Sequence, residues 1–290
     1  MKTWSPIFVA LAALCWGLAG GVAALLMSWG WDAFVVSFYR GAVGFAFVLG
    51  WLLLHPQKSG LGNRRLWLWS ALAGLGIAGN FVFYFVSISE GSVAVAATLM
   101  YCAPVFVYFI SVLLKIEDFS MIKAAAIGLV LIGVVLLTRL YGMDGEAFGL
   151  VGVGTGLLAG FSYALFIFGF KYASKHGSPQ SILAVAFATV VAVLLWLVDR
   201  REVLDVLATV DWPLFAALGV FGAGLSFILY FTGLKNTAPT TASVVAMVEP
   251  VVASLFGILV LSENLVGIQI FGMILILVAV TALSIYTASK

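Results

Sequence analysis

Two side chains of opposite charge lie inside long apolar stretches of the sequence. Glu249 is the one charged residue of the run 236–262, and Arg40 is the one charged residue of the run 33–54. Together a guanidinium and a carboxylate can hold a zwitterionic ligand, and a carboxylate alone can exchange a proton. The same two residues can also form a buried ion pair that only fixes two helices together. The sequence leaves these three roles open.

Polar and aromatic side chains recur at comparable depths of other apolar stretches. Asn80 and Tyr84 share one helical face at a spacing of four, and Ser226 and Tyr230 repeat that spacing later in the chain. Either such residues line a cavity, or they fill protein core and satisfy their polar atoms locally. The residues predicted to bind a small-molecule ligand are Trp16, Asn80, Tyr84, Tyr101, Tyr163, Ser226 and Tyr230.

The elements that must position these residues are membrane-spanning helices. The 290-residue chain is 64% hydrophobic and 9% charged, whereas soluble domains carry roughly 25% charged residues. Because so few polar groups cannot cover a water-soluble globule, most of the surface must face lipid. Runs of about 20 apolar residues fit membrane helices. Ten are predicted: 6–28, 33–54, 66–88, 91–114, 121–138, 149–171, 179–198, 212–234, 238–261 and 265–287.

The distribution of basic residues predicts the orientation of the chain. With ten spans both termini lie on one side, together with ten of the fourteen Lys and Arg residues, whereas three lie on the other side and Arg40 lies within a helix. Cytoplasmic loops are the basic ones. We therefore expect a multi-pass protein of the inner (cytoplasmic) membrane with both termini in the cytoplasm.

A weak internal repeat appears when the chain is shifted by 146 residues. Pro104 then falls on Pro250, and Glu117 on Glu263. Each half, 1–144 and 145–290, holds five spans, and this odd number requires opposite orientations in the membrane. The fold class is thus an all-α polytopic membrane protein with ten transmembrane helices in two inverted five-helix repeats.

The two repeat-related prolines, Pro104 and Pro250, are predicted to kink their helices, since each removes one backbone hydrogen bond. Glu249 has no counterpart, because Ala103 precedes the first of these prolines. The kinks belong to the shared scaffold and either face the central cavity or simply bend the helices. The carboxylate, in contrast, breaks the symmetry of the halves.

Inverted repeats with a site at mid-membrane are the architecture of many secondary transporters. An intramembrane enzyme would need paired carboxylates, HExxH-like metal ligands or an activated nucleophile, whereas the spans hold a single mid-membrane carboxylate and no histidine. A channel is a second alternative. No cofactor, metal or nucleic-acid motif is found, so the expected partners are a small molecule and the lipid bilayer. Internal duplication makes a monomer sufficient for function.

Three stretches carry a family resemblance. They are "SFYRGAVGFAFVL" (37–49), "CAPVFVYFISVLLKIED" (102–118) and "VEPVVASLFGILVLSENLVGIQIFGMILILVAV" (248–280). The chain resembles the drug/metabolite transporter superfamily, in particular its ten-helix, two-repeat EamA-type exporters, and looks most like bacterial exporters of aromatic and other amino acids. The resemblance implies export of amino acids or similar small metabolites by alternating access. Export of drugs or other metabolites is the alternative.

Overall fold

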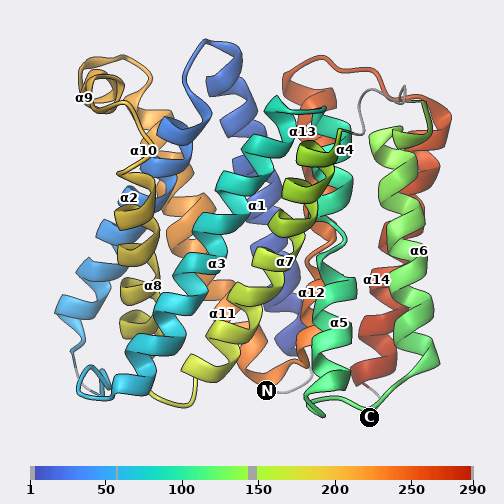
Figure 1. Cartoon of the computed structure of the whole chain (residues 1–290), viewed down its shortest axis with the longest axis horizontal. Helices are drawn as coiled ribbons and strands as arrows, with labels where there is room; N and C mark the ends of the chain where they lie inside the picture. The colour runs from blue at the N-terminus through green and yellow to red at the C-terminus, as the bar shows by residue number, and fades with distance from the viewer. Residues whose placement is uncertain (1–3, 57, 143–148, 289–290) are drawn as a thin grey trace.

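The computed structural model describes residues 4–56, 58–142 and 149–288. All regular secondary structure in this part of the chain is helical. Seven helices are continuous: α1 (Ser5–Ser28), α2 (Ala33–Leu54), α3 (Arg64–Ser89), α6 (Met121–Thr138), α7 (Leu150–Ala173), α8 (Pro179–Leu194) and α14 (Gly267–Ala288). They form a bundle that runs between the upper and lower ends of the molecule in Figure 1. Within the described residues, nine spans are long and apolar enough to cross a membrane, and α8 is a tenth, shorter apolar helix.

Three of the spans are interrupted. The fourth divides into α4 (Val93–Met100) and α5 (Ala103–Leu113), and the ninth into α12 (Pro239–Val245) and α13 (Val248–Val260). The eighth contains a π-helical turn (Val220–Leu225) between α10 (Trp212–Gly219) and α11 (Ser226–Asn236). Outside the spans lie the short amphipathic helix α9 (Arg200–Ala208) and a 3-10 turn at Leu140–Gly142.

The breaks in the fourth and ninth spans occur at repeat-related places. Pro104 and Pro250 lie in the first turn of α5 and α13, where a backbone N–H would find no acceptor within the helix. Each helix therefore restarts at its proline instead of bending smoothly through it. Glu249 is thereby placed in the first turn of α13 rather than in the middle of a regular helix.

Polar residues at the ends of spans define where helices begin. Asp32 Oδ1 accepts hydrogen bonds from the backbone N–H groups of Phe34 and Val35, and this cap starts α2. Asn63 and Ser178 start α3 and α8 in the same way. The apolar run predicts a seventh span that reaches residue 198, but α8 ends at Leu194. The chain turns over 195–198, and Asp199 then caps α9.

The helix contacts follow the inverted repeat. α3 packs along α7. The span that is repeat-related to α3, made of α11 and the π turn, packs in the same way along α1, the counterpart of α7. Two further pairs of repeat-related helices also pack together, α2 with α8 and α6 with α14. α1 begins and α14 ends at the same end of the molecule, here called the termini end, and α9 lies at the other, the distal end (Figure 1). The prediction of ten helices in two inverted repeats is confirmed. The exact division at residues 144 and 145 stays a prediction.

Candidate functional site

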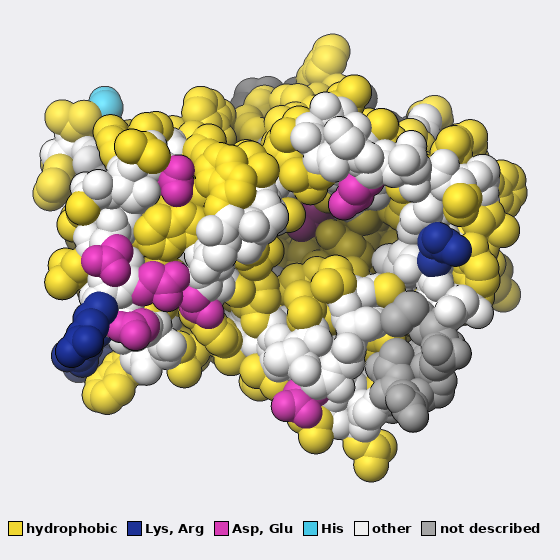
Figure 2. Space-filling model, turned by 90° about the horizontal axis from the view of Figure 1, so that it is seen from above, with side chains coloured by type: hydrophobic (Ala, Val, Ile, Leu, Met, Phe, Trp, Pro, Cys, Tyr) yellow, Lys and Arg dark blue, Asp and Glu magenta, His cyan; other side chains and the backbone are white. Residues whose placement is uncertain are grey.

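A cavity of about 800 Å³ enters the molecule between the two repeats. Its lining comes from α1, α2, α3, α4 and the start of α13, and it includes Ser28, Asp32 and Ser89 beside the distal loops. Viewed from the distal end, the molecule is hollowed near its centre, and mostly hydrophobic side chains surround the hollow (Figure 2). The cavity therefore opens at the end opposite the termini, and its walls are largely apolar.

Arg40 supplies the positive charge at the bottom of this cavity. Its Nε and Nη2 donate to the carbonyl oxygen of Gly222 at 3.0 and 2.9 Å. Gly222 lies in the π-helical turn, where the regular backbone ladder is interrupted and a carbonyl can accept from a side chain. The guanidinium also lies 5.2 Å from the centroid of the Phe81 ring, within cation–π range. One side of the guanidinium is thus held by protein, and the residue lines the cavity.

Glu249 supplies the negative charge at the same depth. Its Oε2 atom is buried and has no hydrogen-bond partner among the residues that the structure describes. The backbone there is fixed by close approach of α1, because a Cβ added to Gly17 would lie 2.6 Å from the carbonyl oxygen of Glu249. Among the described residues, Lys123–Glu117 is the one ion pair, so no Arg40 nitrogen is within 4.0 Å of the Glu249 carboxylate. Both charges line the cavity without neutralising each other directly.

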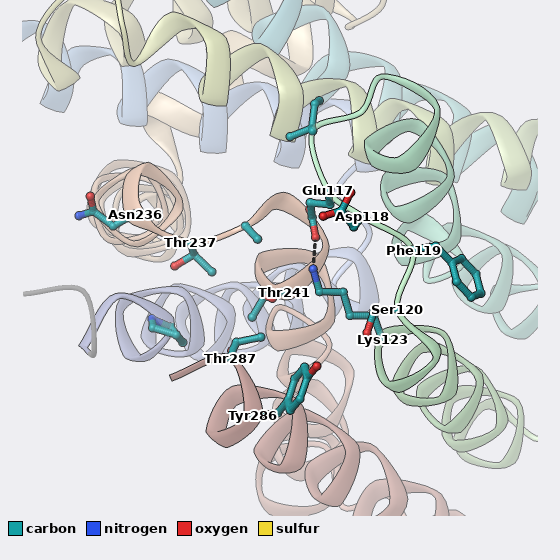
Figure 3. Close-up of a pocket in the computed structure, with 13 residues that line it drawn as sticks. Glu117, Asp118, Phe119, Ser120, Lys123, Asn236, Thr237, Thr241, Tyr286 and Thr287 are labelled. Carbon is teal, nitrogen blue, oxygen red and sulfur yellow. Dashed lines mark hydrogen bonds and ion pairs between the residues drawn. The ribbon is translucent and has the colours of Figure 1, made fainter. Parts of the chain in front are cut away.

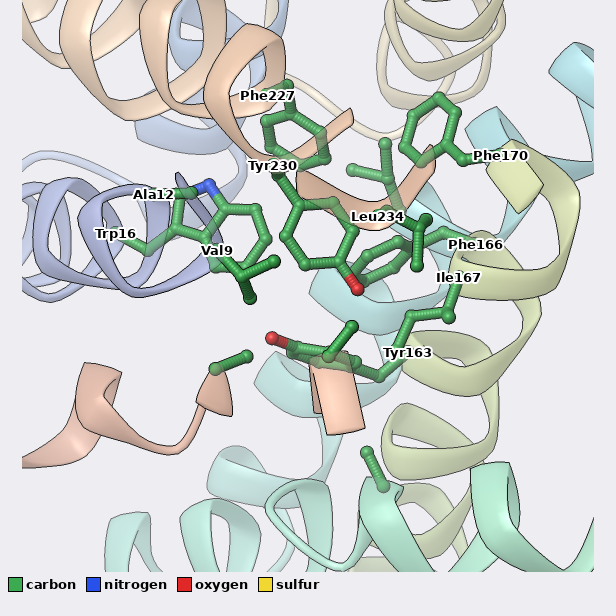
Figure 4. Packing of buried hydrophobic residues seen from close by; sticks show 14 of the residues in the cluster. Val9, Ala12, Trp16, Tyr163, Phe166, Ile167, Phe170, Phe227, Tyr230 and Leu234 are labelled. Carbon is green, nitrogen blue, oxygen red and sulfur yellow. The ribbon is translucent and has the colours of Figure 1, made fainter. Parts of the chain in front are cut away.

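Trp16 separates the cavity from a dense cluster of rings beneath it. Its indole Nε1 donates to Ser226 Oγ at 3.0 Å, and its ring centroid lies 4.9 Å from that of Tyr230. Figure 4 shows how Trp16, Tyr163, Tyr230 and neighbouring Phe side chains converge from α1, α7 and α11. A small extension of the cavity, about 40 Å³, reaches these rings past Arg40 and Glu249.

The structure brings most of the sequence-predicted residues to one place. The large cavity is lined by Trp16, Arg40, Asn80, Tyr84, Tyr101 and Glu249, and its small extension by Tyr163 as well. Ser226 and Tyr230 line neither space: both are 0% exposed and support Trp16 from behind. Asn80 is oriented by a hydrogen bond from its Nδ2 to the carbonyl oxygen of Ala159.

Several cavity residues were not predicted from the sequence. Phe81 and Phe85 follow Asn80 and Tyr84 directly along α3, and Ser37 precedes Arg40 by one turn of α2. Phe81 and Phe85 belong to a long apolar run in which no single phenylalanine stands out. Ser37 did offer a signal, since a hydroxyl one turn from an intramembrane arginine shares its helical face. Within the described residues, no cluster of three or more His, Cys, Asp or Glu forms a metal site.

Comparison with known proteins shows a family match and a shared fold over nearly the whole chain. The model of the EamA-like transporter family matches residues 3–139 and 150–285. An uncharacterized transporter of Archaeoglobus fulgidus is 31% identical over 269 residues, which cover 91% of each chain. The threonine/homoserine exporter RhtA of Salmonella typhimurium is 25% identical over 287 residues, covering 96% of this chain and 91% of that protein. A protein of known crystal structure shares the fold, with a TM-score of 0.78, 17% identity and complete coverage of both chains.

Proposed function

Because the chain belongs to the EamA-like transporter family, we propose that it is a secondary transporter that exports amino acids, aromatic ones among them, or similar small metabolites. One observation supports the proposed substrate class. Arg40 and Glu249 line the same cavity without pairing with each other, and one oxygen of the Glu249 carboxylate has no hydrogen-bond partner in the described part of the chain. The α-carboxylate of an amino acid matches Arg40, and its ammonium matches Glu249.

Apolar walls support a substrate that has a hydrophobic part as well as two charges. Besides the two charged residues, the cavity is lined by Met27, Phe34, Val36, Phe81 and Phe85. Binding sites that combine mostly apolar walls with a few convergent polar groups orient small amphiphilic molecules. Tyr84 and Tyr101 add hydroxyl groups near the charges, which suits an amino acid whose side chain points along the aromatic wall.

Two arguments support export across the inner membrane. RhtA is named an exporter, and the distribution of basic residues favours cytoplasmic termini. With that orientation, the cavity is open to the outside in this structure, as a transporter that has released its substrate would be. A single chain supplies the whole cavity, so a monomer is sufficient for this function.

Counterflow in proteoliposomes with a panel of labelled amino acids tests the proposal. Arg40→Gln and Glu249→Gln should each reduce exchange at least tenfold, since each removes one charge that would hold the substrate. Arg201→Gln and Asp205→Asn, exposed on α9, make matched charge changes outside the cavity and should exchange like the parent.

The outcomes separate the competing functions. If the parent protein exchanges cationic drugs but no amino acid of the panel, the proposed substrate class is wrong and the transporter function is retained. Ohmic single-channel currents in place of saturable exchange would indicate a channel. Loss of folded Arg40→Gln and Glu249→Gln protein on detergent chromatography would assign the two charges to scaffolding.

A further inference from the structure

Glu117 joins the two repeats at the termini end. Its Oε1 accepts hydrogen bonds from both the backbone N–H and the Oγ1 of Thr240, each at 3.0 Å, in the first turn of α12. Its Oε2 pairs with Lys123 (Figure 3). Since Glu117 follows α5 in the first repeat and Thr240 lies in the first turn of α12 in the second, this one carboxylate ties the two halves together.

Its repeat-related counterpart at the distal end makes no such tie. Glu263 occupies the equivalent position after α13, and the local turn is the same: the N–H of Glu117 donates to Ser111 O, and that of Glu263 donates to Gly257 O. Yet Glu263 is exposed and its carboxylate accepts no hydrogen bond in the described part of the chain. Two carboxylates in equivalent places are thus in opposite states.

The helices beside these carboxylates show the same asymmetry. α5 packs against α12 at the termini end, whereas the equivalent pair, α13 and α4, makes no comparable contact among the described residues. The large cavity lies where that contact would be, with Val93 of α4 and Ala253 of α13 both on its wall. Closing the distal end would bring the turn after α13 to the first turn of α4, the counterpart of α12.

Buried hydroxyl groups mark the closed region. Ser111 Oγ in α5 and Thr241 Oγ1 in α12, beside the Glu117 contact, are buried and have no hydrogen-bond partner within residues 4–56, 58–142 and 149–288. Such groups cost free energy while they stay dry. Thr241 also borders a pocket of about 530 Å³ at the termini end, which Glu117 and Lys123 line as well (Figure 3). Both hydroxyls would gain water if α5 and α12 moved apart.

We propose that Glu117 and Glu263 act in turn as latches: each carboxylate, when it is bound to the other repeat, holds one end of the protein shut. In this structure Glu117 holds α12 and keeps the termini end shut, and Glu263 is released. In the reciprocal state Glu263 holds the first turn of α4, shutting the distal end, and Glu117 is released. The inference rests on the proposed transport function for its purpose, but the states themselves are measurable without any substrate.

Thiol labelling distinguishes the two states. In a chain with Cys15→Ala and Cys102→Ala, Thr241→Cys reports opening at the termini end and Ala24→Cys, on the cavity wall, reports opening at the distal end. A membrane-impermeant maleimide is applied to each face of oriented vesicles. We expect Glu117→Ala to raise the labelling rate of the first reporter about tenfold and to lower that of the second, because charge-assisted contacts of the shut state are lost.

The reciprocal changes make the test specific. Glu263→Ala should raise the labelling rate of Ala24→Cys relative to that of Thr241→Cys. In the double variant Glu117→Ala/Glu263→Ala, the ratio of these two rates should return toward its value in the parent. Asp118→Ala removes an adjacent exposed carboxylate and should leave both rates unchanged. Thr240→Val, which keeps the side-chain shape and removes one donor to Glu117, should act in the same direction as Glu117→Ala but more weakly.

Equal labelling in the Glu117→Ala, Thr240→Val and Asp118→Ala variants would overturn the latch, whatever the substrate is. Shifted labelling without exchange of any amino acid would instead support the latch and overturn the proposed substrate. Should Glu117→Ala fail to fold, Thr240→Val alone decides the question against Asp118→Ala.

Discussion

The hydroxyls of buried tyrosines differ in whether the protein satisfies them. Those of Tyr163 and Tyr230, in the ring cluster below the cavity, are buried and have no hydrogen-bond partner among the described residues. That of Tyr39, in a separate cluster with Phe215, donates to the carbonyl oxygen of Val203. An unsatisfied buried hydroxyl costs roughly 1–3 kcal/mol, and a satisfied one contributes about 1 kcal/mol. The same chemical change should therefore have opposite effects at different positions.

Tyr230→Phe should leave the folded protein as stable as the parent or raise its stability by about 1 kcal/mol, because it removes a polar group that has no partner. Tyr39→Phe should lower stability by about 1 kcal/mol. Thermal unfolding in detergent, monitored by size-exclusion chromatography, measures the stability of both variants. A marked loss of stability for Tyr230→Phe would show that its hydroxyl is satisfied after all, by ordered water.

Close helix contacts place the charged residues of the cavity. α1 crosses α13 at Gly17, where an added Cβ would lie 2.6 Å from Glu249 O and 2.7 Å from Val252 Cβ. Gly20, one turn further along α1, lies beside the cavity and has no heavy atom within 4 Å of such a Cβ. The two glycines are a matched pair in the same helix.

Gly17→Ala should destabilise the fold by about 1–3 kcal/mol and displace Glu249, since the atoms in the way are largely backbone and cannot rotate aside. Gly20→Ala should leave stability unchanged or raise it by up to about 1 kcal/mol, because the added methyl group meets no neighbouring atom and alanine favours the helix. Thermal unfolding and the counterflow assay check the pair together. Indistinguishable variants would mean that α1 and α13 are further apart than the structure places them.

The orientation of the chain across the membrane follows from its charge distribution and is still a prediction. We expect alkaline phosphatase fused after Lys290 to be inactive, because the enzyme folds only outside the cytoplasm, and the same enzyme fused after Gly142 to be active. Green fluorescent protein at both sites should give the reverse pattern. Active phosphatase after Lys290 would invert the orientation, and the cavity would then open to the cytoplasm.

Features that depend on local pattern were predicted well. Helix positions follow from runs of about 20 apolar residues, which lipid requires, and the inverted repeat follows from five spans per half. Trp16, Arg40, Asn80, Tyr84, Tyr101 and Glu249 lie together because polar groups within apolar spans must face protein or water. Ser226 and Tyr230 follow the same pattern but turn toward Trp16, and only side-chain packing distinguishes these two situations.

The order of apolar and polar residues determines that the protein faces lipid, that it has ten spans and that its halves are inverted. Each of these properties depends only on local stretches of sequence. Whether Arg40 and Glu249 pair, which end is open, and which of two equivalent carboxylates is engaged depend on distances between segments far apart in sequence. An inverted repeat admits two reciprocal packings of nearly the same contacts. The tertiary structure selects one of them, with Glu117 bound to α12 and Glu263 released.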